Sequence, residues 1–362
     1  MKAAVLREVG KPLAIEELQI RKPGPHEVLI RTVAAGVCHS DLHFVEGSYA
    51  FPMPVVLGHE SAGVVEAVGG EVRTVAPGDH VITCLSVFCG HCEDCLTGHM
   101  SLCRNPEVRP GPGAGPPRLE GATGPVNQFA SLSSFAEQML IHEHACVAIR
   151  KDMPLDRAAL IGCGVMTGVG AVIHTAQVKP GESVAVIGCG GVGLSAINGA
   201  AIAGAARIIA IDAVASKANL ARHFGATDFV DASVGDPVAQ VMQLTGGGVH
   251  HSFEAIGLAR TAEQAFEMLR RGGTANVIGM IPVGQTLSLM GAAFLGEKRI
   301  QGCSMGSNRF PVDMPRLVDF YLDGRLKLDE MISRRIRLED VNAAFAEMKT
   351  GQIARSVITF DA

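Results

Sequence analysis

The stretch "VAVIGCGGVGLSA", residues 184–196, decides how the middle of the chain folds. A short apolar run typical of a buried strand meets a glycine cluster, and an Ala-rich segment typical of a helix follows. Gly188, Gly190 and Gly193 give the spacing G-x-G-x-x-G. The spacing alone is a weak signal, but here it follows a strand and opens a helix. Because a helix N-terminus favours anions, the stretch predicts a site for a dinucleotide pyrophosphate.

The sequence after this stretch alternates between strand and helix patterns. The apolar run "RIIAID" at residues 207–212 precedes a polar helical stretch, and strand-like runs follow at 226–231, 250–257 and 274–280. Strand alternating with helix predicts an α/β fold with a doubly wound parallel sheet covered on both faces. Asp212 ends the second strand, where a carboxylate accepts hydrogen bonds from ribose hydroxyls and repels a 2′-phosphate. We therefore predict NAD rather than NADP.

The length of the chain predicts two domains. A chain of 362 residues is longer than a single hydrophobic core usually accommodates. The N-terminal part reads as short strands separated by turns, and the tail from about residue 308 lacks the strand–helix repeat. We predict a first domain at residues 1–160, to which 308–362 returns, and a dinucleotide-binding domain at 161–307.

Composition argues against several classes of partner. The net charge is -5 and no Lys/Arg-rich block occurs, so we expect no nucleic-acid or membrane partner. The most apolar run, residues 194–211, contains Arg207 and predicts a buried helix followed by a buried strand. The first residues show no signal-peptide pattern, which predicts a cytoplasmic protein. Ten cysteines in a reducing compartment indicate metal or catalytic chemistry before disulfides.

Four of these cysteines lie in "CGHCEDCLTGHMSLC", residues 89–103. Their spacing is C-x2-C-x2-C-x7-C, and four thiolates can close a tetrahedral shell around zinc with no open position. The rival bacterial iron–sulfur run has a shorter last gap and a Pro after the fourth Cys, whereas Arg104 stands here. We predict a structural zinc held by Cys89, Cys92, Cys95 and Cys103.

A second group of chemically active residues fills "GVCHSDLHFVEG", residues 36–47, which contains a thiol, two imidazoles, a hydroxyl and a carboxylate. His59 and Cys163 come from separate stretches, "LGHESAG" and "IGCGVMTG". A catalytic zinc takes three protein ligands and keeps one position free. Cys38, His59 and Cys163 would supply such a set.

Taken together, these motifs resemble the zinc-dependent medium-chain alcohol dehydrogenases. "GVCHSD", "GHESAGVVEAVGGEV", the four-Cys lobe, "GCGVMTG" and "GCGGVG" fall in that family's order and at its approximate spacing, over essentially the whole chain. The resemblance implies a GroES-like β-rich catalytic domain before the Rossmann domain, two Zn2+ per subunit and NAD. It also implies reversible oxidation of an alcohol to its aldehyde.

The resemblance also implies roles in proton transfer. Ser40 would lie beside the alcohol oxygen, and His43 at the solvent end of a proton relay. Asp41 would hold the second ring nitrogen of His59, which fixes the tautomer of that ligand. Glu60 would lie near the metal. The chemistry agrees, because zinc lowers the pKa of a bound oxygen and the released proton then needs a path out of a dry site.

At the cofactor, the resemblance implies a contact between His39 and the pyrophosphate, where many relatives carry Arg. Because histidine titrates, cofactor affinity is predicted to change around neutral pH. The full set of implied cofactor residues is His39, Thr167, Gly188, Gly190, Gly191, Val192, Gly193, Asp212, Lys217 and Arg355.

For the substrate, the resemblance implies a channel lined by Tyr49, Leu85, Phe129 and Ile281. The family often carries an aromatic residue where Leu85 stands, so a wider channel and an aromatic or medium-sized primary alcohol are expected. One alternative keeps the machinery but takes a formaldehyde adduct of glutathione or mycothiol. Another is a zinc-binding protein without catalysis, and the complete ligand set argues against it.

Assembly is predicted from one loop. The Gly/Pro-rich segment between Cys103 and Phe135 is nearly as long as in the dimeric branches of the family, which favours a homodimer. A strand near residues 274–280 would build the dimer sheet in relatives. No role is predicted for Cys84, Cys146, Cys189 and Cys303.

Overall fold

The computed structural model describes residues 1–360, and the chain forms two compact units. Unit 1 contains Met1–Cys163, Arg309–Asp323 and the chain from Ile332; unit 2 contains Gly164–Asn308 and Gly324–Met331. Residues 324–331 thus join unit 2, although the sequence analysis gave the whole tail to the first domain. The functional domain boundaries stay a prediction.

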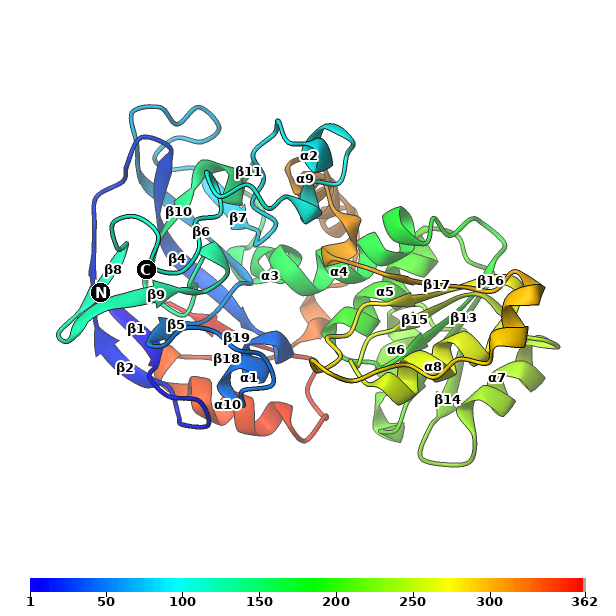
Figure 1. Cartoon of the computed structure of the whole chain (residues 1–362). Helices are drawn as coiled ribbons and strands as arrows, with labels where there is room; N and C mark the ends of the chain where they lie inside the picture. Colours follow the sequence, from blue (N-terminus) through cyan, green and yellow to red (C-terminus); the bar gives the residue numbers. More distant parts are fainter. Residues whose placement is uncertain (361–362) are drawn as a thin grey trace. The chain divides into compact units, whose positions relative to one another are not determined.

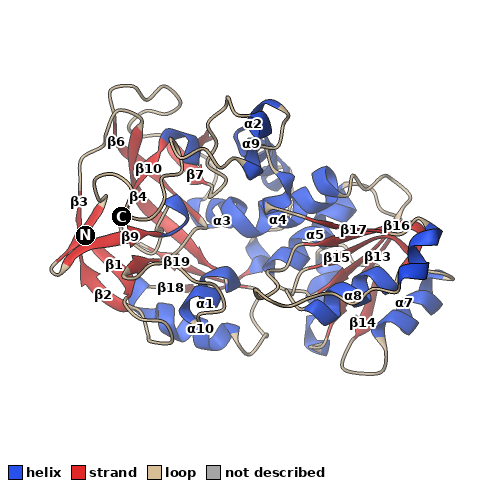
Figure 2. Cartoon of the chain, viewed as in Figure 1, coloured by secondary structure: helices blue, strands red, loops and turns tan. Residues whose placement is uncertain are grey.

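Unit 1 is built mainly of strands (Figure 2). Its elements are β1 (Lys2–Leu6), β2 (Ala14–Glu17), β3 (Gln19–Ile20), β4 (Glu27–Val37), α1 (His39–Val45), β5 (Val55–Val56), β6 (Ser61–Val68), β7 (His80–Thr83), α2 (Glu93–Leu96), β8 (Leu119–Gly121), β9 (Gly124–Gln128), β10 (Gln138–His142), β11 (Cys146–Ile149), α3 (Leu155–Leu160), α9 (Phe310–Leu322), β18 (Ile332–Ile336), α10 (Val341–Met348) and β19 (Arg355–Thr359).

The long strand β4 organises unit 1. Its sequence "EVLIRTVAAGV" is rich in β-branched residues, and most of its side chains are buried. It pairs antiparallel with β6, β10 and β19 in a seven-stranded sheet. Because Ala35 of β4 lies opposite Ser61 of β6, the end of β4 meets the start of β6. Cys38 and His59, which follow and precede those strands, are brought together in this way.

Unit 2 carries the parallel sheet (Figure 1). Its elements are α4 (Met166–Gly170), β12 (Ser183–Ile187), α5 (Gly191–Ile202), β13 (Arg207–Asp212), α6 (Ala218–His223), β14 (Asp228–Asp231), α7 (Pro237–Thr245), β15 (Val249–Glu254), α8 (Ala259–Glu267), β16 (Leu269–Val277) and β17 (Arg299–Gly302). The strand order is β14-β13-β12-β15-β16-β17 and every pair is parallel. This is the doubly wound order, and the predicted α/β fold class is confirmed.

The predictions for the most apolar run and for the dimer strand can be compared with the structure. Residues 194–211 form most of α5 and β13, so the predicted helix followed by a strand is confirmed. One helical segment, Leu155–Thr175, is long and apolar enough to cross a membrane, but 83% of its apolar window is buried inside the protein. Among the described residues, β16 has a neighbouring strand on each side and β17 forms the edge of the sheet, and the part that this region plays in a dimer stays a prediction.

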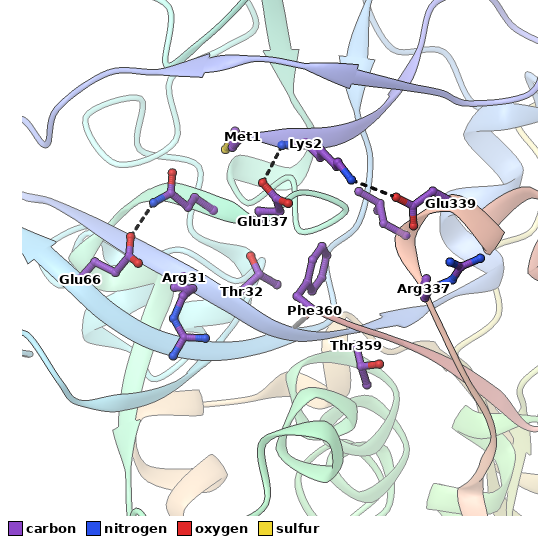
Figure 3. A pocket seen from close by; sticks show the side chains of 12 residues that line it. Met1, Lys2, Arg31, Thr32, Glu66, Glu137, Arg337, Glu339, Thr359 and Phe360 are labelled. Atoms are coloured by element: carbon purple, nitrogen blue, oxygen red, sulfur yellow. Dashed lines mark hydrogen bonds and ion pairs between the residues drawn. The ribbon is translucent and has the colours of Figure 1, made fainter. Parts of the chain in front are cut away.

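A hollow of about 570 Å³ lies in unit 1, beside β1 and β4 (Figure 3). Charged side chains dominate its wall, and several pair with one another: Glu137 accepts from the Lys2 backbone N–H at 2.7 Å, and Lys2 Nζ lies 3.5 Å from Glu339. None of the sequence-predicted site residues lines it. The predicted metal, cofactor and substrate residues therefore lie outside this hollow.

Candidate metal and cofactor sites

The three predicted ligands of the catalytic zinc lie together in unit 1. Cys38, His59 and Cys163 are all buried, and their potential ligand atoms lie within 4.8 Å of one another. The hydrogen bond from Cys163 lowers the pKa of Cys38 well below its usual range, although burial opposes the shift. Two thiols and one imidazole in a buried pocket are a donor set that zinc prefers, and they leave a fourth position for another ligand.

Each ligand comes from a different element. Cys38 stands between β4 and α1, His59 immediately before β6, and Cys163 within a single π-helical turn at Ile161–Val165. Such turns insert an extra residue into a helix and occur frequently at functional sites. Gly162 allows this turn to pack closely, because a Cβ there would lie 2.8 Å from the Thr83 carbonyl oxygen.

Asp41 fixes the orientation of His59. Its Oδ1 lies 3.0 Å from His59 Nδ1 and accepts a hydrogen bond from the Gly58 backbone N–H at 3.0 Å. Burial would lower the pKa of His59, but the charge of Asp41 and the hydrogen bond to it raise that pKa well above its usual range. The bond holds Nδ1, so Nε2 is the nitrogen left for a metal, as predicted.

Glu60 and Arg355 form a buried ion pair beside these ligands. Arg355 Nε and Nη2 lie 3.1 Å and 3.0 Å from the two carboxylate oxygens of Glu60. Arg355 is only 4% exposed, so it is not a surface charge. Gly36 makes room for the pair, because a Cβ there would lie 2.0 Å from Glu60 Oε1.

Ser40 and His43 lie three residues apart in α1, on one face of the helix. Ser40 Oγ is 3.7 Å from Cys38 Sγ, so the hydroxyl lies at the edge of the three-ligand site. The His43 ring contacts Tyr49, with centroids 5.9 Å apart. The described residues show no direct hydrogen bond between Ser40 and His43, so a relay needs a further group between them.

The four-Cys lobe forms a second ligand cluster in unit 1. Ligand atoms of Cys89, Cys92, Cys95 and Cys103 all lie within 4.8 Å of one another. Cys92 Sγ is 3.5 Å from Cys95 Sγ and 3.8 Å from Cys103 Sγ. Four thiols this close, without a disulfide, fit a closed tetrahedral zinc shell.

In unit 2, the glycine-rich turn between β12 and α5 packs as the G-x-G-x-x-G spacing predicts. Gly188 has φ +97°, a conformation that favours glycine, and Gly190 is the N-cap of α5. A Cβ on Gly193 would lie 1.7 Å from the Gly188 carbonyl oxygen, so only glycine permits this strand–helix contact. Gly191 and Val192 form the first turn of α5, whose free N–H groups suit a phosphate.

Asp212 lies at the end of β13, next to this turn. Its Oδ2 accepts a hydrogen bond from the Cys189 backbone N–H at 2.7 Å and pairs with Lys217 Nζ at 2.9 Å. The carboxylate is thereby fixed at the carboxyl edge of the sheet, where ribose binds in this fold.

Two other predicted cofactor residues differ in exposure. Thr167 is buried in α4, and its hydroxyl lies 3.5 Å from Met305 Sδ. His39 is exposed at the start of α1.

Three of the predicted substrate residues belong to unit 1, and the fourth, Ile281, belongs to unit 2. The Phe129 ring stands edge-on to His59, with centroids 5.9 Å apart at 72°. Leu85 packs against a different cluster, which includes the four-Cys lobe.

Two further aromatic residues pack around Phe129 and were not predicted from the sequence. The rings of Phe44 and Phe51 stand edge-on to the Phe129 ring, with centroid distances of 4.7 Å and 5.5 Å. We call these three residues the aromatic wall. The aromatic letters in "HFVEGSYAF" were the available signal, but only the fold shows that they meet Phe129. The cysteines without a predicted role are buried or half-buried, and burial raises the pKa of Cys84 to about 11 and that of Cys146 to about 12.

Comparison with known proteins supports these assignments at the level of the family. Residues 24–151 match the alcohol dehydrogenase GroES-like domain, and residues 191–322 match the zinc-binding dehydrogenase family. The chain is 39% identical to a protein of Schizosaccharomyces pombe (strain 972) named "Probable S-(hydroxymethyl)glutathione dehydrogenase 1", over 99% of this chain and 96% of that one.

Solved structures agree. An alcohol dehydrogenase zinc-binding domain protein from Burkholderia ambifaria is 38% identical with a TM-score of 0.95, covering 100% of this chain and 99% of that chain. Benzyl alcohol dehydrogenase from Acinetobacter calcoaceticus is 34% identical with a TM-score of 0.93, covering 99% of each chain. The chain therefore belongs to the zinc-dependent medium-chain alcohol dehydrogenase family and is an oxidoreductase of that family.

Proposed function

We propose that this protein is an NAD-dependent, zinc-dependent dehydrogenase that reversibly oxidises a primary aromatic or medium-sized alcohol to its aldehyde. The observation that carries the proposal is the buried Cys38–His59–Cys163 set, with an aromatic wall beginning at His59. An aromatic wall favours an aromatic substrate ring, because edge-to-face contacts add to the free energy of burial. The similarity to benzyl alcohol dehydrogenase supports the same substrate class.

We propose that two zinc ions bind each subunit. Cys38, His59 and Cys163 would hold the catalytic ion, and the four-Cys lobe the structural one. Zinc supplies a Lewis acid that makes an alcohol easier to deprotonate, and NAD, when bound, accepts the hydride.

The protein's own groups orient the substrate and move the proton. Asp41 keeps His59 in one tautomer, and Ser40 Oγ, at the edge of the site, is placed to accept the alcohol proton. His43, on the same face of α1, is placed to pass a proton on towards solvent. Since the described residues show no direct hydrogen bond between Ser40 and His43, a further group would have to lie between the two side chains for a proton to pass.

The cofactor proposal rests on Asp212. Its fixed carboxylate next to the glycine-rich turn favours ribose hydroxyls and opposes a 2′-phosphate. Gly188, Gly190 and Gly193 would admit the pyrophosphate to the N-terminus of α5. Arg355 stays a proposed cofactor residue, and its guanidinium also forms two hydrogen bonds with the Glu60 carboxylate.

A second candidate substrate is the thiol adduct of formaldehyde. The 39% identity to a protein named for S-(hydroxymethyl)glutathione favours it. The metal and cofactor residues would keep their roles under this alternative, because only the group attached to the alcohol carbon changes.

One set of measurements tests the proposal. NADH formation is followed with benzyl alcohol, cinnamyl alcohol, hexanol, ethanol, and formaldehyde with and without glutathione, and NADP is tested beside NAD. Turnover of the ring-bearing alcohols with NAD is expected. Turnover restricted to formaldehyde plus glutathione would move the proposal to the second candidate, and turnover with NADP alone would reject the cofactor assignment.

Zinc content provides an independent test. Two zinc ions per chain are expected by atomic absorption, with one lost in Cys103→Ser and none in Cys84→Ser, which changes a buried thiol outside both clusters. Equal zinc content in the two variants would reject the structural site.

The remaining proposals concern the setting of the enzyme. We propose that it works in the cytoplasm on a small alcohol or aldehyde and forms a homodimer. The long Cys103–Phe135 segment supports the dimer.

A further inference from the structure

Phe129 is the aromatic residue in direct contact with a predicted metal ligand. It is 7% exposed, and its ring stands edge-on to His59. Phe44 and Phe51 contact its ring from other sides, both edge-on. The direction of this ring therefore decides the shape of the protein surface next to His59.

The backbone that follows Phe129 is strained. Ala130, Ser131 and Ser133 have φ values of 52°, 60° and 61°, and none of them is a glycine. Residues with a Cβ avoid this left-handed region, and a run of them persists only where the surroundings hold it. Some specific contact has to hold this turn in place.

The hydroxyl of Ser133 supplies such a contact, in addition to the backbone hydrogen bonds from the N–H groups of Leu132 and Ser133 to the Phe129 carbonyl oxygen. Ser133 Oγ accepts a hydrogen bond from the Phe129 backbone N–H at 2.9 Å and donates one to the Val56 carbonyl oxygen at 2.7 Å. Ser133 is 2% exposed, so water cannot easily replace either bond. The hydroxyl thus joins the start of the strained turn to β5, which leads to His59.

The residues after Ser133 bind the same stretch. The Ser134 backbone N–H donates to the Gly58 carbonyl oxygen and the Phe135 N–H to the Leu57 carbonyl oxygen, each at 3.0 Å. A Cβ on Gly58 would lie 2.6 Å from Ser134 Oγ, which shows how tightly the two segments pack. The turn and the residues before His59 therefore form one assembly.

We propose that Ser133 is a positioning residue that holds Phe129 against His59 and thereby sets the preference for ring-bearing over short alcohols. The specificity part rests on the proposed function. The positioning part rests only on the contacts of Ser133. Ser133 touches neither substrate nor metal, and it acts through the ring of Phe129.

The test compares Ser133→Ala with Ser131→Ala. Both changes remove a hydroxyl from a serine with nearly equal φ in the same turn, but the described contacts include a side-chain hydrogen bond for Ser133 and none for Ser131. Ser133→Gly is the second variant, because glycine accepts this φ without strain and the variant should fold even if Ser133→Ala does not.

Two readouts are needed. The first is the 19F NMR spectrum of the zinc-loaded proteins labelled with 4-fluorophenylalanine, in which Phe129→Leu identifies the Phe129 signal. The second is kcat/KM for benzyl alcohol divided by that for ethanol. Zinc content is measured throughout, so that loss of the metal is recognised.

Both Ser133 variants should shift or broaden the Phe129 signal and lower the benzyl-to-ethanol ratio about tenfold, mainly through KM, with zinc content unchanged. Ser131→Ala should leave signal and ratio as in the wild type. An unmoved Phe129 signal in both Ser133 variants would overturn the proposal, as would an equal change in Ser131→Ala. A shifted signal in a protein that oxidises no alcohol would support the positioning role while rejecting the proposed function.

Discussion

Single buried charges carry much of the free energy at the metal site. Glu60 is fully buried and Arg355 almost so, and the two side chains form an ion pair. Taking two charges out of water is costly, and their geometry has to compensate. Removing one partner leaves the other charge buried without the ion pair that offsets the cost of its burial.

We expect Glu60→Gln to lower the free energy of unfolding by about 3–5 kcal/mol, because Arg355 stays charged in a buried position. Urea denaturation measures the effect. The double variant Glu60→Gln/Arg355→Met should lose less than the sum of the two single variants. Additive losses would show that the pair does not couple energetically.

A second residue-scale prediction concerns His142. Burial, together with the nearby charge of His144, lowers the pKa of His142 to about 4. Its pKa in the unfolded chain is about 6.5, so the unfolded state binds a proton first as the pH falls. Stability should therefore fall between pH 6.5 and about 4 and stay level below that window. The loss should be about 1–2 kcal/mol after allowance for solvent screening.

Replacing His142 with Asn tests this, because Asn Oδ1 can accept the His144 backbone N–H that His142 Nδ1 accepts at 3.0 Å. Urea midpoints are measured from pH 7 to 4, with zinc content followed at each pH. His26 and Glu143 lie nearby and remain in both proteins. Parallel pH profiles for wild type and His142→Asn would contradict the prediction.

At the scale of elements, the turn between β12 and α5 has separable structural and binding glycines. A Cβ at Gly193 meets a carbonyl oxygen at 1.7 Å, whereas one at Gly190 meets nothing within 4 Å. Gly193→Ala should lower the free energy of unfolding by about 1–3 kcal/mol through overpacking. Gly190→Ala should keep wild-type stability but bind NAD more weakly, because glycine there allows the pyrophosphate to approach.

Thermal denaturation and calorimetric NAD titration distinguish the two effects. Equal stability of the two variants would contradict the packing argument. Full NAD affinity in Gly190→Ala would contradict the binding argument.

Elements also show what the sequence could predict. The strand–glycine–helix pattern and the spacing of the four-Cys lobe are local, so the parallel sheet and that cluster could be predicted from adjacent letters. The Cys38–His59–Cys163 set joins three separate stretches of sequence. The ion pair of Glu60 with Arg355 joins residues 295 positions apart, and only the pairing of β19 with β4 brings them together. The resemblance pointed to Arg355 as a cofactor residue, which stays a prediction, but it gave no sign of the ion pair with Glu60. The Phe44–Phe51–Phe129 wall and the strained turn likewise depend on tertiary packing, which local patterns do not encode.

At the scale of the whole molecule, one exposed apolar segment bears on assembly. Val283, Met290 and Leu295 are 80%, 76% and 86% exposed, in the stretch between β16 and the edge strand β17. Exposed apolar side chains gathered in one segment are characteristic of an interface. This segment, rather than β16 itself, is where we expect the proposed homodimer to form.

Leu295→Glu should convert the dimer to a monomer, because a charge would be buried at the interface. Leu96→Glu is the matched control, since Leu96 is 73% exposed but lies in the four-Cys lobe. Sedimentation equilibrium gives the mass of each. A monomeric wild type, or a dimer lost only in Leu96→Glu, would reject this interface.

The position of β19 in the sheet has a consequence for synthesis on the ribosome. β19 pairs with β4, yet translation makes β4 first and the whole of the parallel sheet of unit 2 before β19. Until then the end of β4, Ala34–Val37, lacks its partner strand β19, and Glu60 has no counter-charge from Arg355. Unit 2 can complete its core while the chain is still growing, as domains commonly do. We therefore expect the Cys38–His59–Cys163 site of unit 1 to be completed late in the synthesis of the chain, after the core of unit 2 has formed.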